Sequence, residues 1–261
     1  MRSGPNIYIM NLTVADVLNL LINLPLSYVD NSSRSWSLGS VMCQIFIFMR
    51  DFSVGLSVYS VVALSIQRYI VIVHPLKFRE GKFGVIKGCG ACIHIVVVWI
   101  MAVTFAVPSL MLATLEGDRC LNAATHFGKE YMHTIWTAQL LVYCVLPVIL
   151  IMILYIKTAF FLRQSTRRIP GNVQYSGLIR QRAKLAHMVV TLTVVFCISY
   201  APNFLVRVLV AWSVMDQHSS CTLYVSFVSY CLFFSNTCFN PIALYLMSSK
   251  FRALFRTYIF F

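Results

Sequence analysis

The sequence predicts an all-α bundle of membrane-spanning helices, and two observations carry that prediction. Of the 261 residues, 59% are hydrophobic and only 11% are charged. A chain of this composition cannot bury its apolar surface in one soluble core, so its long apolar runs are expected to face lipid. The basic residues lie between these runs instead of forming one patch. The formal charge of +13 is therefore interpreted as a topology signal and not as a nucleic-acid-binding surface.

The apolar runs are long enough to cross a bilayer, for which a helix needs roughly 20 residues. The predicted spans cover residues 6–29, 43–73, 85–112, 131–162, 180–212 and 222–247. A short amphipathic helix is expected at 250–258, with basic residues towards lipid headgroups and aromatic residues towards acyl chains. We interpret the whole chain, 1–261, as one membrane domain.

Charge alternates between successive loops, and this alternation predicts the orientation of the chain. The basic segments lie near Arg2 and at 77–87, 163–184 and 250–256. The loops between them hold the acidic residues Asp30, Glu116, Asp118, Glu130 and Asp216. By the positive-inside rule the basic segments are cytoplasmic, so both ends of the chain are expected inside.

Two charged residues within the predicted spans mark candidate sites, because ionisable groups in a membrane are costly unless they face a partner or water. Asp16 lies in the middle of the first span and is expected to point into the bundle. It either helps to bind a cation there or is a protonated acid that is hydrogen-bonded to its neighbours. Arg50 lies near the outer end of the span 43–73 and is a candidate for ligand binding. The alternative for Arg50 is a structural pair with Asp51 or another carboxylate.

The span 43–73 is expected at the centre of the bundle. Small side chains let neighbouring membrane helices approach closely, and this span carries Ser53, Gly55, Ser57 and Ser60. A later span contains Pro202, which removes one helix hydrogen bond and supplies a kink. The inner half of that helix is therefore expected to be able to swing.

Short motifs and single marker residues follow one another in a fixed order along almost the whole chain. The central span begins at Cys43 and ends in SIQRY at 65–69 followed by HPL. Its companions are NLTVADVL at 11–18, Trp36, Trp99, Cys120, Pro147, Tyr155, Phe196, Pro202 and NPIALY at 240–245. This set resembles the rhodopsin-like G-protein-coupled receptors. Within that family, the NPIALYLMSSKFR and IRQRAKLA segments resemble the peptide-receptor branch of bombesin, endothelin and CCHamide receptors.

The resemblance implies a multi-pass receptor of the plasma membrane that has no enzymatic activity. It would bind an extracellular neuropeptide and activate a heterotrimeric G protein. The positions expected to line the ligand cavity are Arg50, Gln139, Asn203, Arg207, Tyr230 and Phe234. Two arginines in that cavity favour a peptide carboxamide or carboxylate end over a cationic amine.

The resemblance also implies covalent and ionic features. It pairs Cys43 with Cys120 in a disulfide, which an oxidising outer compartment permits. It places an allosteric Na⁺ at Asp16, Ser57, Asn236 and Asn240. No other cofactor and no metal site is expected.

The coupling and switch positions implied by the resemblance depart from the family pattern in two places. These positions are Gln67, Arg68, Tyr69, Tyr155, Phe196, Tyr200, Pro202, Pro241 and Tyr245. Gln67 replaces the usual acidic neighbour of Arg68, which weakens the restraint on the guanidinium and favours raised ligand-independent signalling. Tyr200 stands where the family has tryptophan, which changes both packing and hydrogen bonding.

The family has seven spans, whereas residues 1–18 resemble its first cytoplasmic loop and second helix. The first helix is therefore expected to be missing, either through truncation or because the protein has six spans. This departure, with Gln67 and Tyr200, keeps a non-signalling decoy as the alternative function. A transporter is a further class, but the internal repeats and matching interrupted helices that would indicate one are not seen.

Overall fold

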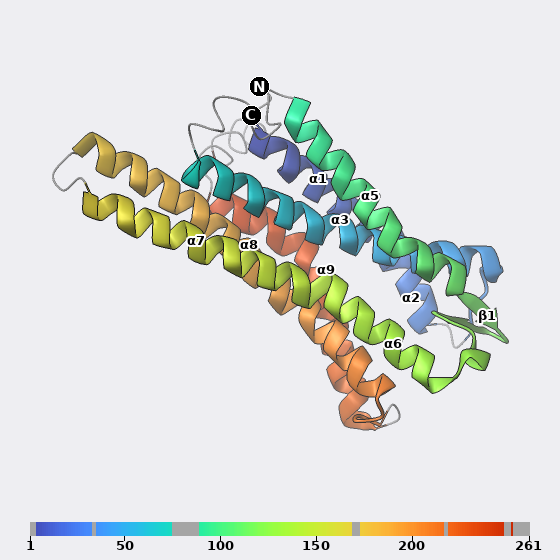
Figure 1. The fold of residues 1–261 in the computed structure, drawn as a ribbon. Coiled ribbons are helices and arrows are strands. Elements are labelled where there is room, and N and C mark those ends of the chain that lie inside the picture. Colours follow the sequence, from blue (N-terminus) through green and yellow to red (C-terminus); the bar gives the residue numbers. More distant parts are fainter. Residues whose placement is uncertain are drawn as a thin grey trace.

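The structure is a computed structural model that describes residues 4–32, 35–74, 89–168, 173–216, 219–247 and 252. Long helices run side by side along one axis and make up almost all of it (Figure 1). Within the described residues, 6 helical segments are long and apolar enough to cross a membrane. The predicted all-α membrane bundle is thus confirmed.

The helices carry most of the chain. In chain order they are α1 (Gly4–Leu18), the π-helical turn η1 (Asn19–Asn23), α2 (Leu24–Ser32), α3 (Gly39–Val73), α5 (Cys89–Leu112), the 3₁₀ turn η2 (Thr125–Phe127), α6 (Gly128–Leu140), the π-helical turn η3 (Leu141–Val145), α7 (Leu146–Arg168), α8 (Val173–Ala211) and α9 (Ser220–Met247). The π-helical turns join α1 to α2 and α6 to α7, so each of these pairs forms one continuous span. The amphipathic helix predicted at 250–258 lies outside the described residues, except for Arg252.

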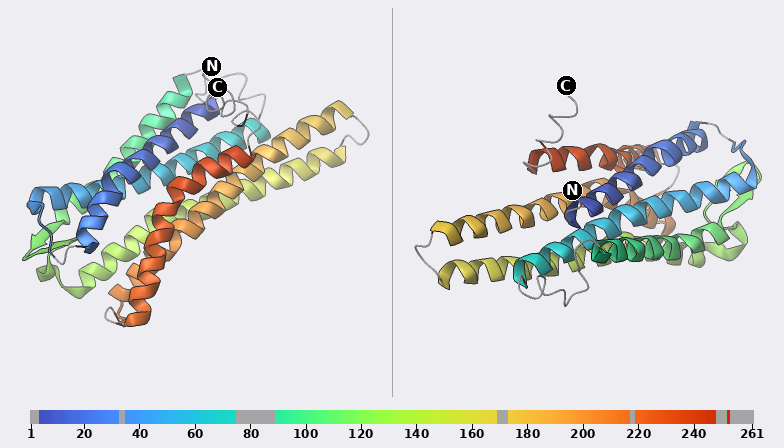
Figure 2. Two further views of the ribbon diagram at one scale, coloured as in Figure 1. Left: turned by 180° about the vertical axis from the view of Figure 1, so that it is seen from behind. Right: turned by 90° about the horizontal axis from the view of Figure 1, so that it is seen from above.

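The helix α3 lies at the centre of the bundle, where it packs against α1, α5, α7 and α8 (Figure 2). Gly55 is a position of close approach between α3 and α5. A Cβ atom on Gly55 would lie 3.3 Å from the backbone Cα of Ala102 and 3.4 Å from the ring of Tyr143. The absence of a side chain at this position therefore permits the close helix contact that membrane bundles need.

A short hairpin caps the outer end of α3. Its strands β1 (Thr114–Glu116) and β2 (Arg119–Leu121) pair in antiparallel fashion. The predicted disulfide is present: it joins Cys43 at the top of α3 to Cys120 in β2, with the Cα atoms 5.6 Å apart. The backbone N–H of Trp36 also donates to the carbonyl of Asp118, at 2.6 Å. Covalent and backbone contacts therefore fix the hairpin above the bundle.

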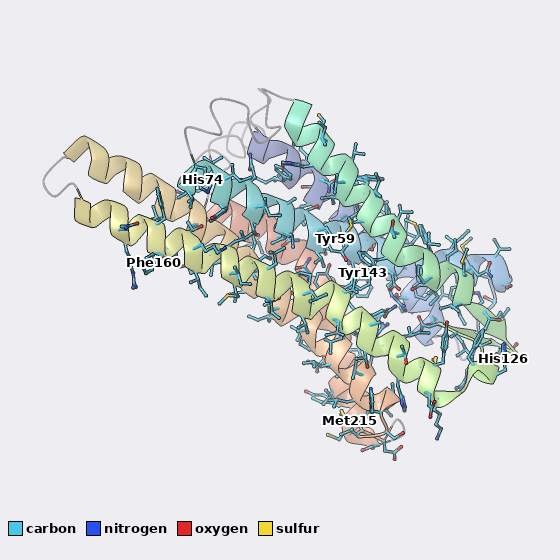
Figure 3. All side chains as sticks on the ribbon, in the orientation of Figure 1. Tyr59, His74, His126, Tyr143, Phe160 and Met215 are labelled. Atoms are coloured by element: carbon cyan, nitrogen blue, oxygen red, sulfur yellow. A yellow bond between two sulfur atoms is a disulfide. The ribbon has the colours of Figure 1, made fainter. Side chains whose placement is uncertain are left out.

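The outer surface of the bundle is apolar, as lipid contact requires. Phe160 on α7 is 73% exposed and projects away from the neighbouring helices (Figure 3). Met111 on α5 and Tyr224 on α9 are similarly exposed. Polar residues such as Asn23, Asn236 and Ser60 are buried instead. This inside-out distribution positions the polar groups of the candidate site in the interior.

Candidate functional site

A buried carboxylate organises the outer half of the bundle. Asp51 on α3 accepts hydrogen bonds from Arg50 Nε at 3.1 Å, from Ser109 Oγ at 2.5 Å and from Gln139 Nε2 at 2.7 Å. Arg50 is 8% exposed and Asp51 is 4% exposed. The alternative considered for Arg50, a structural pair with Asp51, is the arrangement in the structure. Gln139, one of the predicted ligand positions, likewise faces this carboxylate.

Arg50 also connects α3 to the hairpin segment. Its Nη2 donates to Oδ1 of Asn122 at 2.6 Å, two residues beyond the disulfide Cys120. One guanidinium therefore contacts both the helix core and the outer loop. Asn122 was not singled out from the sequence, because nothing in the residues around it indicates which helix its side chain will meet.

Arg207 on α8 lies on the other side of the outer cavity. Its guanidinium carbon is 4.9 Å from the ring centroid of Trp136, a cation–π arrangement. Arg50 repels Arg207, whereas the carboxylates of Asp51 and Asp30 attract it. Arg207 thus has a stacking partner and counter-charges, but no salt bridge within 4.0 Å among the described residues.

The remaining predicted ligand positions lie on α8 and α9. Asn203 is buried one helical turn below Arg207. The rings of Tyr230 and Phe234 are 5.0 Å apart in an edge-on arrangement. Electrostatic interaction also couples Tyr230 to Arg207. The structure therefore brings Asn203, Arg207, Tyr230 and Phe234 into one region.

Ring contacts lead from this region down to the switch position. Phe234 contacts Phe233 at 5.2 Å between centroids, and Phe233 contacts Tyr200 at 5.0 Å. Tyr200 in turn lies 4.8 Å from Phe196. Phe233 was missed at the level of the sequence, since an aromatic residue on an apolar helix carries no signal of its own. The rings form a continuous packed chain from α9 to the inner half of α8.

The candidate cation site is assembled across three helices. Nδ2 of Asn240 on α9 donates to both carboxylate oxygens of Asp16 on α1, at 3.2 and 3.1 Å. Asn236 donates to the hydroxyl of Tyr200 at 3.1 Å, and Ser57 shares a hydrogen bond with the same hydroxyl. The phenol at the departure from the family pattern therefore enters the polar cluster directly.

The inner end of the bundle holds the predicted coupling residues. Arg68, Tyr69 and Tyr155 line one small cavity of about 20 Å³ between α3 and α7. Gln67 is buried next to them. Among the described residues, neither Oε1 of Gln67 nor Nε of Arg68 has a hydrogen-bond partner. The amide and the guanidinium are neighbours in the chain but do not satisfy each other.

The prolines of the switch lie inside helices, as expected. Pro202 is within α8 and Pro241 is within α9. Tyr245 lies half-buried near the end of α9. These positions are consistent with hinges, because each proline removes one helix hydrogen bond.

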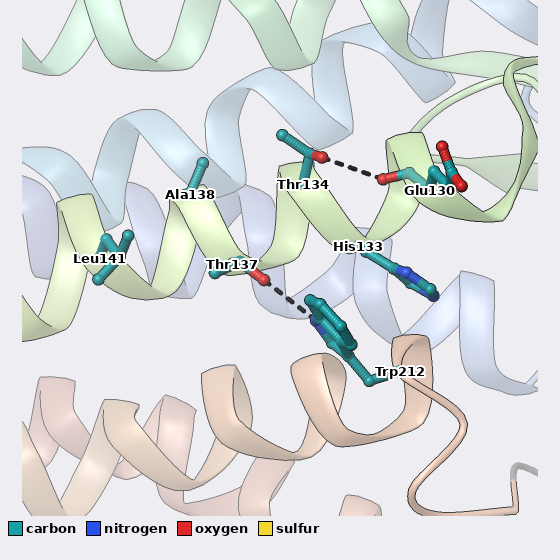
Figure 4. Close-up of a pocket in the computed structure, with 7 residues that line it drawn as sticks. All are labelled: Glu130, His133, Thr134, Thr137, Ala138, Leu141 and Trp212. Carbon is teal, nitrogen blue, oxygen red and sulfur yellow. Dashed lines mark hydrogen bonds between the residues drawn. The ribbon is translucent and has the colours of Figure 1, made fainter.

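A larger cavity lies away from the predicted ligand positions. It measures about 570 Å³ and opens between the outer ends of α6 and α8, where Glu130, His133, Thr137 and Trp212 line it (Figure 4). Nε1 of Trp212 donates to Oγ1 of Thr137 at 3.2 Å, and the ring of His133 stacks on Trp212 at 4.7 Å. None of the predicted ligand residues lines this cavity.

The hairpin contains a pH-sensitive contact outside the membrane. The exposed carboxylate of Glu116 accepts hydrogen bonds from Oγ1 of Thr125 at 2.6 Å and from its backbone N–H at 2.8 Å. These bonds hold the pKa of Glu116 below its ordinary value of 4.5. Because the folded-state pKa is lowered, the contact stabilises the fold above pH 4.5 and is lost as the pH falls through the folded value.

We therefore expect the amide of Thr125 to lose protection from hydrogen exchange under acid conditions, after correction for the intrinsic exchange rate. Glu116→Gln is the matched control, since its amide oxygen still accepts a hydrogen bond but does not titrate. If protection of the Thr125 amide in the unmodified chain does not change with acid pH, the amide is not held by the ionised carboxylate of Glu116.

These features define a membrane receptor, and comparison with known sequences identifies its class. Residues 1–245 match the family described as 7 transmembrane receptor (rhodopsin family), and the chain belongs to this family. It is a multi-pass protein of the plasma membrane, as these receptors are.

The relatives are receptors for peptides, in line with the branch expected from the sequence. The chain is 31% identical to the neuropeptide CCHamide-1 receptor of Drosophila melanogaster, covering 100% of this chain and 54% of the relative. It is 30% identical to bombesin receptor subtype-3 of Ovis aries (100% and 67%) and 28% identical to galanin receptor 2b of Danio rerio (96% and 65%). The chain spans about half the length of the Drosophila receptor.

Proposed function

We propose that this protein is a neuropeptide receptor that activates a heterotrimeric G protein. One observation carries the proposal: ring contacts connect the outer region of Arg207 and Tyr230 to Tyr200, two residues before the kinked Pro202. A ligand that repacks Phe234 would therefore move a ring on the helix that contains the hinge. The peptide-receptor relatives agree with this reading.

The chemistry of the outer region favours a peptide with carbonyl or carboxamide groups at its end. Arg207 offers a guanidinium whose orientation is set by Trp136. Arg50 is already occupied by Asp51 and Asn122, so it orders the floor of the cavity instead of contacting the ligand first. A planar guanidinium pairs well with an amide or carboxylate oxygen. A cationic amine would meet Arg207 and Arg50 and be repelled.

The ligand acts by shifting an equilibrium between two arrangements. It can do so only by its difference in affinity for the two states. The inner half of α8 swings about Pro202, and the crevice of Arg68, Tyr69 and Tyr155 opens from its closed size of about 20 Å³. The carboxyl-terminal helix of the G protein then docks in that crevice. The receptor itself makes and breaks no covalent bond.

An allosteric Na⁺ at Asp16 is part of the proposal, and the residues fit the ion. A hard cation prefers oxygen ligands. The carboxylate of Asp16 and the hydroxyl of Ser57 supply two, and Oδ1 of Asn236 is a buried acceptor with no hydrogen-bond partner among the described residues. Asn240 orients the carboxylate from α9. Bound Na⁺ would supply positive charge that stabilises the inactive arrangement.

Asp16→Asn is expected to remove the effect of Na⁺ on thermal stability, because the amide offers no negative charge to the ion. The measurement is the melting temperature of the purified protein in NaCl against choline chloride at equal ionic strength. Exposed Glu130→Gln is the matched control and should retain the full Na⁺ effect. An undiminished response in Asp16→Asn would rule out this site.

The experiment that tests the proposed function is G-protein activation in cells that express the chain. It is measured unstimulated and after a panel of small neuropeptides, with and without an additional apolar span fused ahead of residue 1. Arg207→Ala is compared with Arg207→Lys, which keeps the charge but loses the planar guanidinium. Peptide-dependent activation that falls in Arg207→Ala supports the proposal. Silence in every arm, with surface expression verified, supports the non-signalling decoy suggested by Gln67 and Tyr200.

A further inference from the structure

A second cavity lies between α5 and α6, on the side of the bundle that faces lipid. It measures about 170 Å³. Phe105, Pro108 and Ala138 of its lining are exposed, and its polar lining residues are Ser109, Asn122, Gln139 and Tyr143, of which Asn122 already accepts from Arg50. It shares Ala138 with the lining of the cavity beside Trp212, and Gln139 is the predicted ligand position in its lining.

Two buried polar atoms of residues that line this cavity have no partner. Gln139 is 8% exposed and Tyr143 is 2% exposed. Among the described residues, neither Oε1 of Gln139 nor the hydroxyl of Tyr143 has a hydrogen-bond partner. A buried polar group without a partner loses its hydration and gains nothing in exchange. Such groups are rare in native proteins, and two in the lining of one cavity call for an explanation.

The orientation of the Gln139 amide is fixed by its neighbours. Its Nε2 donates to Oδ2 of Asp51 at 2.7 Å and to Oγ of Ser109 at 3.4 Å. If the nitrogen and oxygen of the Gln139 amide were interchanged, the oxygen would lie against the carboxylate of Asp51, which is unfavourable. The free atom is therefore the carbonyl oxygen, an acceptor. The hydroxyl of Tyr143, which lines the same cavity, can both donate and accept.

The helix is locally modified at this position. Tyr143 lies in the π-helical turn η3 (Leu141–Val145), and Gln139 lies four residues before it, at the end of α6. Such turns occur preferentially at functional sites, because the extra residue widens the helix. The ring of Tyr143 also stacks on Phe204 of α8, with centroids 6.1 Å apart. A molecule in the cavity would consequently contact a ring that packs against the hinge helix.

We propose that this cavity binds an uncharged alcohol with an apolar tail, which enters from the bilayer. A hydroxyl group satisfies both partners, since it donates to Oε1 of Gln139 and accepts from Tyr143. The carboxylate of Asp51 is already paired with Arg50, so a cationic ligand gains no counter-charge. The volume is below the roughly 300 Å³ of a complete drug-sized site, so only the hydroxyl end enters and the tail remains in lipid.

The test uses the chain in phosphatidylcholine nanodiscs and a pair of photoreactive probes. One probe is an eight-carbon primary alcohol that carries a diazirine, and the other is the same diazirine alkane without the hydroxyl. Labelled peptides are mapped by mass spectrometry, with excess octanol as competitor. We expect the alcohol to label segments 105–112 and 135–143 about tenfold more than the alkane, which is the effect of one good hydrogen bond.

Variants distinguish the site from general partition into lipid. Val142→Phe fills the cavity and should remove the labelling, whereas Leu141→Phe adds the same ring to the neighbouring cavity and should not. Tyr143→Phe removes one of the two hydrogen-bond partners and should reduce labelling by the alcohol towards the level of the alkane, while Oε1 of Gln139 still accepts. Melting temperatures establish that each variant is folded; if Val142→Phe is not, Tyr143→Phe decides alone. Equal labelling by both probes would show that the cavity does not recognise a hydroxyl group, and undiminished labelling by the alcohol in Tyr143→Phe would show that Tyr143 is not its partner; either result overturns the proposal.

Discussion

Asp51→Leu is expected to lower the free energy of unfolding by about 3–5 kcal/mol, the cost of breaking a buried ion pair by removing one partner. The carboxylate is the common acceptor for Arg50, Ser109 and Gln139, which come from α3, α5 and α6. Without it, the guanidinium of Arg50 remains buried with only Asn122 as a neutral partner.

The double variant Arg50→Met with Asp51→Leu is the decisive control. Replacing both members of a buried pair by apolar residues of similar volume is often neutral in free energy. We therefore expect the double variant to recover most of the stability, with a coupling between the two positions of roughly 2 kcal/mol or more. The free energy of unfolding of Asp51→Asn should lie between those of Asp51→Leu and the double variant, since the asparagine keeps hydrogen bonding but loses the charge.

The measurement is unfolding of the purified protein in one detergent, followed by tryptophan fluorescence and repeated across the four members of the cycle. If the effects of the two single variants on the free energy of unfolding are additive, Arg50 and Asp51 do not stabilise the fold as a pair. The same cycle shows whether the pair is needed for ligand binding. If the stable double variant still responds to peptide, Arg50 orders the cavity and Arg207 carries the ligand contact.

Much of the helical framework could be predicted because it follows from composition and from charge in the loops. The burial of Asp16 followed from the cost of a carboxylate in lipid, and its contact with Asn240 agrees with the resemblance. The pairing of Cys43 with Cys120 was likewise implied by family order, and the structure contains it. The burial of Asp16 depends on depth in the membrane, which the sequence encodes directly, whereas the disulfide pairing came from the resemblance.

The two π-helical turns follow from a signal in the sequence that was not used for prediction, namely a proline shortly after each turn. η1 ends at Asn23, just before Pro25, and η3 ends at Val145, just before Pro147. A proline ring clashes with the carbonyl four residues earlier, and widening the turn relieves the clash. Pro108, Pro202 and Pro241 instead lie within α-helices. A proline therefore indicates where the geometry of a helix can change, but the packing of neighbouring residues determines whether a π-helical turn forms or the helix stays α-helical.

The contacts of Arg50 with Asn122 and of Arg207 with Trp136 could not be derived from the sequence. Each joins residues that are about seventy positions apart in the chain. Their meeting depends on how the hairpin lies above α3 and how α6 is rotated against α8. Rotation of a helix changes its neighbours without changing its hydropathy. The sequence therefore predicted how deep the ligand-site residues lie in the membrane. Which of these residues contact each other could be seen only in the structure.

Gln67→Asp is expected to lower ligand-independent G-protein activation by about tenfold to a hundredfold, if the protein signals as proposed. A hydrogen bond to a charged group contributes roughly 1.5–3 kcal/mol, and each 1.4 kcal/mol shifts an equilibrium tenfold. Nε of Arg68 and Oε1 of Gln67 have no partners among the described residues, so the guanidinium has donors to offer. A carboxylate at position 67 would hold Arg68 in the closed crevice.

The matched control is Gln67→Asn, which has the same length as the aspartate variant but no charge. Basal activation is measured at equal surface expression, because a restrained receptor is also a more stable one and reaches the membrane in larger amounts. If Gln67→Asp and Gln67→Asn reduce activation equally, side-chain length and not charge governs the restraint. If neither variant changes a measurable basal activity, Arg68 is restrained elsewhere and Gln67 is not the weak point of the switch. The charge-specific decrease is the result that links Nε of Arg68, which has no partner among the described residues, to signalling without ligand.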